Sequence, residues 1–92
     1  MAARSYREAV EAGNFFEIQS LATRRTFGSW GCDTIAETIF WAVKHGVIVA
    51  GERCEITRHL PGSRIGAVYA EVVGYCAAVP CAGITLNDLA EA

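Results

Sequence analysis

Four side chains of this chain are of the types that hold zinc in proteins, and they fall into two pairs. Cys54 precedes His59, and Cys76 precedes Cys81, with four residues between the members of each pair. Most structural zinc sites use a tighter knuckle spacing, because both ligands of a pair must close around one ion. We therefore expect no metal and no cofactor, although the spacing leaves open whether these four residues ever bind one. His59, beside the turn "LPGS", is expected to be a solvated loop residue.

A catalytic thiol would need a base close enough to withdraw its proton. Cys32 has only Asp33 as its neighbour, and His45 lies about one helix length further along the chain. The sequence also lacks the glycine-rich phosphate-binding patterns and the Gly-x-Ser-x-Gly pattern of serine nucleophiles. These observations predict that the protein is not an enzyme.

The composition describes one small and rather apolar domain. The chain has 92 residues, of which 52% are hydrophobic and 20% charged, with a formal net charge of −2. This length supports a single domain over residues 1–92, and the apolar content is too high for a disordered chain. It is also high for a small monomer, so we expect part of the apolar surface to meet a partner.

We expect the sequence to contain no signal for export or membrane insertion. The N-terminus "MAARSYREAVEAG" has no apolar core of the kind found in secretory signals. The longest uncharged run, "VVGYCAAVPCAGITLN", is interrupted by Pro80 and is shorter than the roughly 20 apolar residues of a membrane span. We expect a cytoplasmic protein without membrane contact, whose cysteines are small buried side chains.

The chain shows repeated helix-start signals, in which Ser, Thr or Asn is followed three residues later by an acidic residue. Such pairs satisfy the N–H groups that the first turn of a helix leaves free. They predict helices over "YREAVEA", "FFEIQSLATRR" and "IAETIFWAVKH", and a short last helix over "LNDLAEA". The pairs are Ser5 with Glu8, Asn14 with Glu17, Thr34 with Glu37, and Thr85 with Asp88.

Two further segments complete the expected fold. The large apolar residues of 63–79 follow a helical stripe, which favours a central helix, but "AVYAEVVGY" is rich in β-formers and leaves a strand as the alternative. The segment around residues 47–58 has no helical stripe and predicts a small β-hairpin. The expected fold class is therefore mainly α (α+β), a compact bundle of four to five helices with one small hairpin.

Three helices followed by a two-stranded ribbon is the order of a winged helix-turn-helix. The segments "IQSLATRRTFGS" and "DTIAETIFWAVKHGVIVAGERCEITR" resemble that family's second helix, third helix and wing, over about half the chain and with about three residues inserted in the turn. The resemblance implies a DNA-binding transcription regulator. Phosphate contacts would then come from Arg24 and Arg25 near the turn and from Arg53 and Arg58 on the wing.

The outer face of the expected helix over 34–45 favours a protein partner over DNA. A helical wheel turns Ile35, Ile39 and Phe40 towards the core and leaves Trp41 outside with Thr38. Base reading and phosphate binding need amide or basic side chains, whereas tryptophan and arginine dominate protein-binding hot spots. The expected protein-binding site is Trp41, Glu37, Lys44 and His45, flanked by Trp30, Arg24 and Arg25.

The sequence thus leads to an expected function and two alternatives. We expect a small protein-binding module that acts as an inhibitor or adaptor, with a homodimer as one form it could take. Phage-encoded anti-defence proteins such as anti-CRISPRs are one group of this size and class. The first alternative is the winged-helix DNA-binding regulator, and the second is a zinc- or thiol-dependent function.

Overall fold

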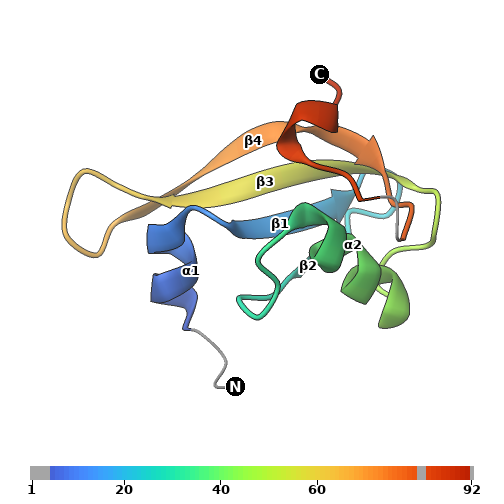
Figure 1. Cartoon of the computed structure of the whole chain (residues 1–92). Coiled ribbons are helices and arrows are strands. Elements are labelled where there is room, and N and C mark those ends of the chain that lie inside the picture. The colour runs from blue at the N-terminus through green and yellow to red at the C-terminus, as the bar shows by residue number, and fades with distance from the viewer. Residues whose placement is uncertain (1–4, 81–82, 92) are drawn as a thin grey trace.

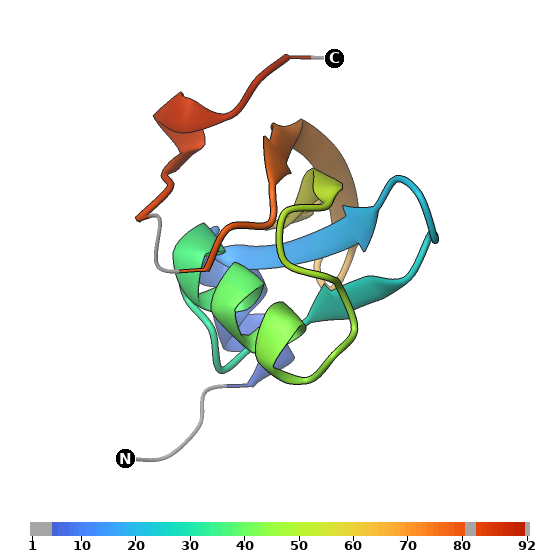
Figure 2. The same ribbon diagram turned by 90° about the vertical axis from the view of Figure 1, so that its right-hand side faces the viewer.

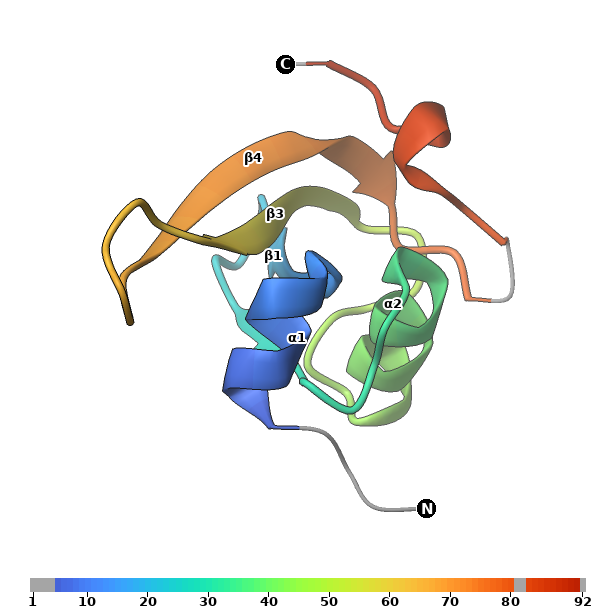
Figure 3. The same ribbon diagram turned by 60° about the vertical axis from the view of Figure 1, so that its left-hand side comes forward.

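The computed structural model describes residues 5–80 and 83–91, and within them the chain forms an α+β fold. Four antiparallel strands make one sheet in the order β2-β1-β3-β4. Helices α1 and α2 both lie below the β3–β4 ribbon, and the short helix η1 lies above it (Figures 1 and 3). The elements are α1 (Tyr6–Ala12), β1 (Phe15–Ser20), β2 (Thr26–Gly28), α2 (Ile35–Lys44), β3 (Arg53–Pro61), β4 (Val68–Ala77) and the 3-10 helix η1 (Leu86–Asp88).

The expected bundle of four to five helices is therefore wrong. Among the residues that the structure describes there are two α-helices and one turn of 3-10 helix, and the sheet is the larger element. The helices that do form are those whose start and stop signals are local. The N–H of Glu8 donates to Ser5 Oγ at 3.2 Å, and the N–H of Ser5 donates to Glu8 Oε1 at 2.9 Å, as in a capping box. Thr34 Oγ1 likewise accepts from the N–H of Glu37 at 3.1 Å and begins α2.

The helix expected over "FFEIQSLATRR" is instead β1 and the turn that follows it. Gly13, at φ 72°, ends α1 in the left-handed conformation, so the chain has already turned before Asn14. From there Phe16, Ile18 and Ser20 are buried at every second position, which is the period of a strand. The buried hydroxyl of Ser20 donates to the carboxylate of Glu52, which satisfies it inside the fold.

This strand also corrects the helix order taken from the winged-helix resemblance. The segment matched to the family's second helix is a strand and a turn, whereas the segment matched to the third helix is α2. The expected hairpin around residues 47–58 is wrong as well, because β3 begins at Arg53 and pairs with β4 and not with residues 47–49.

Residues 63–79, for which a helix was favoured, form the hairpin loop and β4. Strand pairing runs from Arg53 opposite Ala77 to Pro61 opposite Val68. Ile56 faces Gly74 while Thr57 faces Val72, so Val73 is an extra residue that forms a β-bulge. The alternation of small and β-branched residues suits this long twisted strand, and the two glycines that weaken a helix are tolerated here.

The core lies between α2 and the sheet, with a smaller cluster beneath α1. Ile35, Ile39 and Ala42 of α2 pack on Ile18 and Ile56 from the two central strands. The smaller cluster joins Ala9 and Val10 of α1 to the start of β1. The buried members of the main core are Phe16, Ile18, Ile35, Ile39, Ala42, Ile48, Cys54, Ile56, Cys76 and Ala78, and those of the smaller cluster are Ala9, Val10 and Phe15.

Residues 83–91 lie alongside the sheet and contain η1 (Figures 1 and 2). The position of this segment is fixed by a pair of hydrogen bonds, in which Tyr75 N donates to Ala90 O at 2.9 Å and Ala90 N donates to Tyr75 O at 2.8 Å. The expected helix over "LNDLAEA" shrinks to one 3-10 turn, with the N–H of Thr85 donating to Asp88 Oδ2 at 2.8 Å.

Gly74 is the residue that allows this segment to lie against β4. Its φ is +150°, and an added Cβ would be 2.5 Å from Cβ of Leu89. We expect Gly74→Ala to lower the free energy of unfolding by roughly 2–3 kcal/mol, because it adds a collision to a strained backbone. Urea unfolding measures this loss, and faster hydrogen exchange at the N–H of Ala90 would locate it.

Gly66→Ala is the matched control for this prediction. Gly66 also has a positive φ, of +83°, but nothing lies within 4 Å of its added Cβ. Its substitution should cost about 1 kcal/mol from backbone strain alone. Equal losses for the two variants would mean that the contact with Leu89 does not constrain position 74.

Candidate functional site

Trp41 lies on the outer side of α2 within a cluster of exposed rings. Its side chain is 39% exposed and stacks on the ring of His45, with the centroids 5.6 Å apart and the planes at 29°. Phe40 meets Trp41 edge to face at 5.2 Å, and Phe27 of β2 lies 5.8 Å from His45. These four residues, Phe27, Phe40, Trp41 and His45, form the α2 aromatic surface.

Two residues of α2 differ from the helical wheel, and the difference enlarges this surface. Phe40, expected in the core, is 37% exposed, whereas Thr38, expected outside, is only 1% exposed. The hydroxyl of Thr38 donates to the carbonyl of Thr34 at 2.8 Å, so a buried threonine leaves no unsatisfied polar group. The core-facing arc of α2 is thus rotated towards Thr38, and Phe40 stands beside Trp41 at the surface.

The charged residues of the expected site lie at opposite ends of α2. Glu37 is in the first turn and Lys44 in the last, which are the positions where their charges complement the helix dipole. His45 caps the helix, with its backbone N–H donating to the carbonyl of Trp41 at 2.9 Å. Four of the predicted site residues, Glu37, Trp41, Lys44 and His45, therefore share one helix, with the rings in the middle and one charge at each end.

The flanking residues of the expected site belong to other parts of the molecule. Trp30 meets Tyr6 of α1 edge to face at 6.2 Å, in a separate ring cluster. Arg24 and Arg25 lie exposed in the β1–β2 turn, where Arg24 has a φ of 64° and its carbonyl accepts from Gln19 Nε2 at 3.2 Å. The structure thus separates Trp30 from the ring cluster of Trp41.

The other two arginines of the expected DNA site are engaged within the sheet. Arg58 Nη2 pairs with Glu71 Oε1 at 2.8 Å, and the guanidinium of Arg53 lies 5.8 Å from the ring centroid of Tyr75. Only Arg53 lies near the β1–β2 turn, because its carbonyl accepts from the N–H of Leu21 at 3.1 Å. A basic surface at this end would consist of Arg24, Arg25 and Arg53, without Arg58.

His59 is a residue that the sequence analysis placed wrongly. It lies on β3 with a largely buried side chain, 4.9 Å from Phe15 between ring centroids, and its Nδ1 is 3.3 Å from the hydroxyl of Tyr6. Its Nε2 is buried without a hydrogen bond, and the nearest carboxylate, Glu17, is 3.8 Å away. The ring therefore joins α1 to the sheet. No local pattern could have shown this, because Tyr6 is 53 residues away along the chain.

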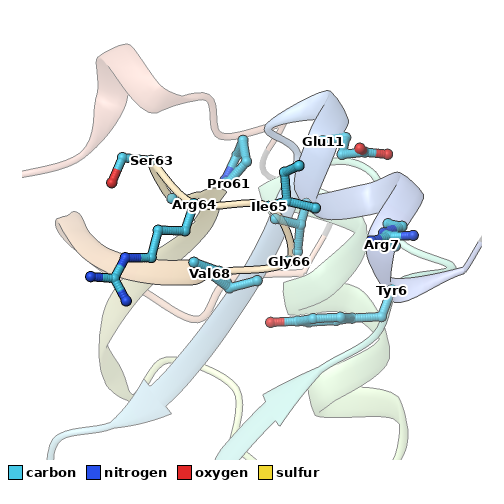
Figure 4. Close-up of a pocket in the computed structure, with 12 residues that line it drawn as sticks. Tyr6, Arg7, Glu11, Pro61, Ser63, Arg64, Ile65, Gly66 and Val68 are labelled. Atoms are coloured by element: carbon cyan, nitrogen blue, oxygen red, sulfur yellow. The ribbon is translucent and has the colours of Figure 1, made fainter.

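A groove separates α1 from the β3–β4 hairpin loop, and Figure 4 shows the side chains around it. Its volume is about 450 Å³, with Tyr6, Arg7 and Glu11 on the helix side. The loop contributes the fully exposed Ile65, and Val68 lies at the start of β4. The groove is an open surface beside the start of β4, lined by both polar and apolar side chains.

The cysteines and His59 do not converge on a common point. Cys54 and Cys76 are directly opposite each other in β3 and β4, both buried. His59 is an odd number of residues from Cys54 along β3, so its side chain leaves the other face of the strand. Within residues 5–80 and 83–91 no group of three or more His, Cys, Asp or Glu side chains could hold a metal ion. Cys81, the fourth candidate ligand, lies outside the described residues.

The thiols of the core are held in their protonated form. Burial, followed by the neighbouring Cys76 and Glu52, raises the pKa of Cys54 from 9.0 to about 11. Burial also raises the pKa of Cys76. Because the thiolate is the reactive species, neither residue is set up as a nucleophile near neutral pH.

No protein-family model matches the chain, and no curated protein or solved structure matches it. Likewise, none of the helices in the described part of the chain has the length and apolar character needed to cross a membrane. The candidate site therefore depends on the geometry of the chain itself.

The raised pKa of Cys54 makes stability depend on pH in the alkaline range. The unfolded thiol ionises near pH 9, but the folded one only near pH 11, so its contribution is full below pH 9 and is lost as the pH rises through 11. We expect the wild-type protein to lose about 1–2 kcal/mol more than Cys54→Ala between pH 8 and pH 11. Urea unfolding at the two pH values measures both losses.

The comparison uses the change with pH within each protein, since Cys54→Ala also leaves a small cavity that lowers stability at every pH. Groups that titrate in both proteins cancel in this difference. Equal losses in the two proteins would show that Cys54 ionises as readily in the folded chain as in the unfolded one.

Proposed function

We propose that this protein is a non-enzymatic module that binds another protein through the α2 aromatic surface. The observation that carries the proposal is the pair of exposed rings, Phe40 and Trp41, which meet edge to face while Trp41 also stacks on His45. Large aromatic side chains are costly to leave in water and contribute strongly to binding when a partner covers them. Because their positions are already fixed, little conformational entropy is lost when they are covered.

The arrangement of rings and charges on α2 indicates what kind of partner surface it would fit. A helix that offers rings in its middle and opposite charges at its ends fits an apolar groove with charged margins. The partner is then a folded protein whose groove accepts Trp41 and Phe40, with a carboxylate near Lys44 and a basic group near Glu37. These rim charges would guide orientation more than affinity.

A protein that works in this way acts as an inhibitor or an adaptor, because its effect comes from occupying a partner's surface. A phage-type anti-defence role, like that of anti-CRISPR proteins, is one form of this function that suits a chain of 92 residues. The proposed place of action is the cytoplasm, where the buried thiols of Cys32, Cys54 and Cys76 would stay reduced.

DNA binding is the weaker proposal because the charges it needs are not presented together. Arg58 is neutralised by Glu71, and α2 offers a glutamate and aromatic rings where a reading helix would offer amide or basic side chains. The remaining arginines at one end of the sheet are a small footprint for phosphate binding.

The proposal is tested by comparing the two exposed tryptophans. Tagged full-length protein is used to capture partners from a lysate of the source cells, and the affinity for a captured partner is then measured by calorimetry. We expect Trp41→Ala to weaken binding about 10- to 100-fold, because it removes the central ring of the surface. Trp30→Ala, which removes an equally large ring elsewhere, should bind like the wild type.

Three results would contradict the proposal: capture of no partner, full affinity in Trp41→Ala, or equal losses in the two variants. Urea unfolding of both variants shows whether a loss comes from the surface or from the fold. If the captured ligand is DNA, with affinity that falls steeply with salt and with Arg53→Ala, a DNA-binding function replaces the present proposal.

A further inference from the structure

The outer edge of β4 is the longest open edge of the sheet. The strand order leaves β2 and β4 at the edges, and β2 has three residues while β4 has ten. Among residues 83–91, the bridge between Ala90 and Tyr75 is the one point at which the C-terminal segment pairs with β4. Figures 1 and 3 show no other element of the described chain beside the half of β4 next to the hairpin loop.

The direction of the free peptide groups on this edge follows from the pairs already described. Tyr75 exchanges backbone hydrogen bonds with Ala90, so its N–H and C=O point away from β3 and the backbones of Tyr75 and Glu55 form a non-bonded pair. Only its side chain reaches Glu55, with the hydroxyl donating to Glu55 Oε2 at 3.2 Å. In antiparallel pairs the bonded and non-bonded positions alternate, so Thr57 and His59 of β3 have the same phase as Glu55.

The residues of β4 opposite those positions therefore point their peptide groups outward. Thr57 faces Val72, His59 faces Ala70, and Pro61 faces Val68. The pair of Pro61 and Val68 agrees with this assignment: proline has no N–H, and a non-bonded position of β3 needs none to reach β4. Val68, Ala70 and Val72 thus offer free donors and acceptors in a row, with their side chains on one face of the strand.

This edge also lacks the usual protection. Proteins guard open edges with lysines, prolines, bulges or short strands. Here Val68, Tyr69 and Val72 are 43%, 51% and 52% exposed. The charge within the stretch, on Glu71, is paired with Arg58 at 2.8 Å, and the bulge lies at the far end, at Val73.

We propose that this edge is the interface of a symmetric homodimer, in which β4 pairs antiparallel with β4 of a second copy about an axis at Ala70. Val68 of each copy then faces Val72 of the other, and the two Ala70 residues face each other across the axis. All three outward-pointing residues meet outward-pointing residues, so each pair exchanges two hydrogen bonds. A shift by one residue would oppose outward and inward groups and lose these bonds.

Self-complementarity is the reason for choosing a second copy over a segment of another protein. The same register that aligns the hydrogen bonds also sets valine against valine and places the smallest side chain at the axis, as a twofold interface requires. Strand pairing alone buries less than the roughly 1,200 Å² of a stable interface. Ile65, which lines the groove of Figure 4, and Tyr69 of β4 are both exposed and supply further apolar surface next to the paired strands.

The C-terminal segment limits how far the two β4 strands can pair. Pairing cannot extend past Gly74, because Ala90 already occupies the edge at Tyr75. The joined sheet would have eight strands, the four of each copy, and would end in the short β2 edges. The proposal is independent of the α2 aromatic surface, which lies on a different element.

The experiment measures the mass of the full-length protein in solution by light scattering and sedimentation, over concentrations up to the order of 100 µM. The wild type is expected at twice the chain mass. Val72→Lys places a charge opposite Val68 at both ends of the interface and should weaken dimerisation at least about 10-fold. Thr26→Lys, which places the same charge on the exposed edge strand β2, should leave the dimer unchanged.

Two further variants test the register of the pairing and separate loss of the dimer from loss of the fold. Val68→Glu combined with Val72→Lys brings a new carboxylate opposite a new ammonium at both ends, so the dimer should return to within about 10-fold of wild-type affinity. Ala70→Pro removes an outward-pointing N–H while leaving the bonds to β3 intact, and it should be a folded monomer by circular dichroism.

The proposal is overturned by a monomeric wild type, by a Val72→Lys variant that dimerises normally, or by a folded double variant that stays monomeric. A monomer whose β4 edge takes up an extended segment of a different protein would also overturn it. Trp41→Ala should not change the mass, so failure of the dimer and failure of the α2 proposal are told apart in the same measurements.

Discussion

The packing of α2 on the central strand pair is the interaction on which the rest of the structure depends. Ile18 and Ile56 are opposite each other in β1 and β3, and Ile39 of α2 covers them; all three are within 1% of complete burial. Each such side chain stabilises the fold by about 1.5–3 kcal/mol relative to an exposed one. Because α2 must turn this face to the sheet, its opposite face has to carry Phe40 and Trp41 into solvent.

The bulge in β4 transmits this constraint to the edge of the sheet. Without an extra residue in β4, inward-facing and outward-facing side chains would alternate regularly along the whole strand. Val73 takes the additional place and packs against the core, while Gly74 makes room for Leu89. The bulge at Val73 therefore decides which peptide groups of β4 face outward, and Gly74 beside it decides where the C-terminal segment lies.

The sequence was sufficient for the features that depend on near neighbours. Ser5, Glu8 and Thr34 identified the starts of α1 and α2, because capping bonds join residues three apart. The pattern of Asn14 and Glu17 imitates the same signal, and it misled because the turn at Gly13 and the two-residue period of β1 prevail there. In β4, apolar residues on both faces resemble a buried helix, and only pairing with β3 distinguishes the two.

In the candidate site, too, features set by neighbouring residues could be predicted and features set by distant contacts could not. The exposure of Trp41 and the placement of Glu37, Lys44 and His45 on one helix follow from helical geometry alone. The separation of Trp30 from Trp41 could not be foreseen, since it depends on Tyr6 meeting Trp30 across the fold.

The pairing of Ala90 with Tyr75 has a consequence for any shortened form of this chain. Cleavage within the segment after β4 would release that tail and uncover the peptide groups of Tyr75. The open edge would then extend over the whole of β4, from Val68 to Ala77, and strands of other copies could pair with it in more than one register. The pairing of Ala90 with Tyr75 thus limits how much of the β4 edge is open to another strand.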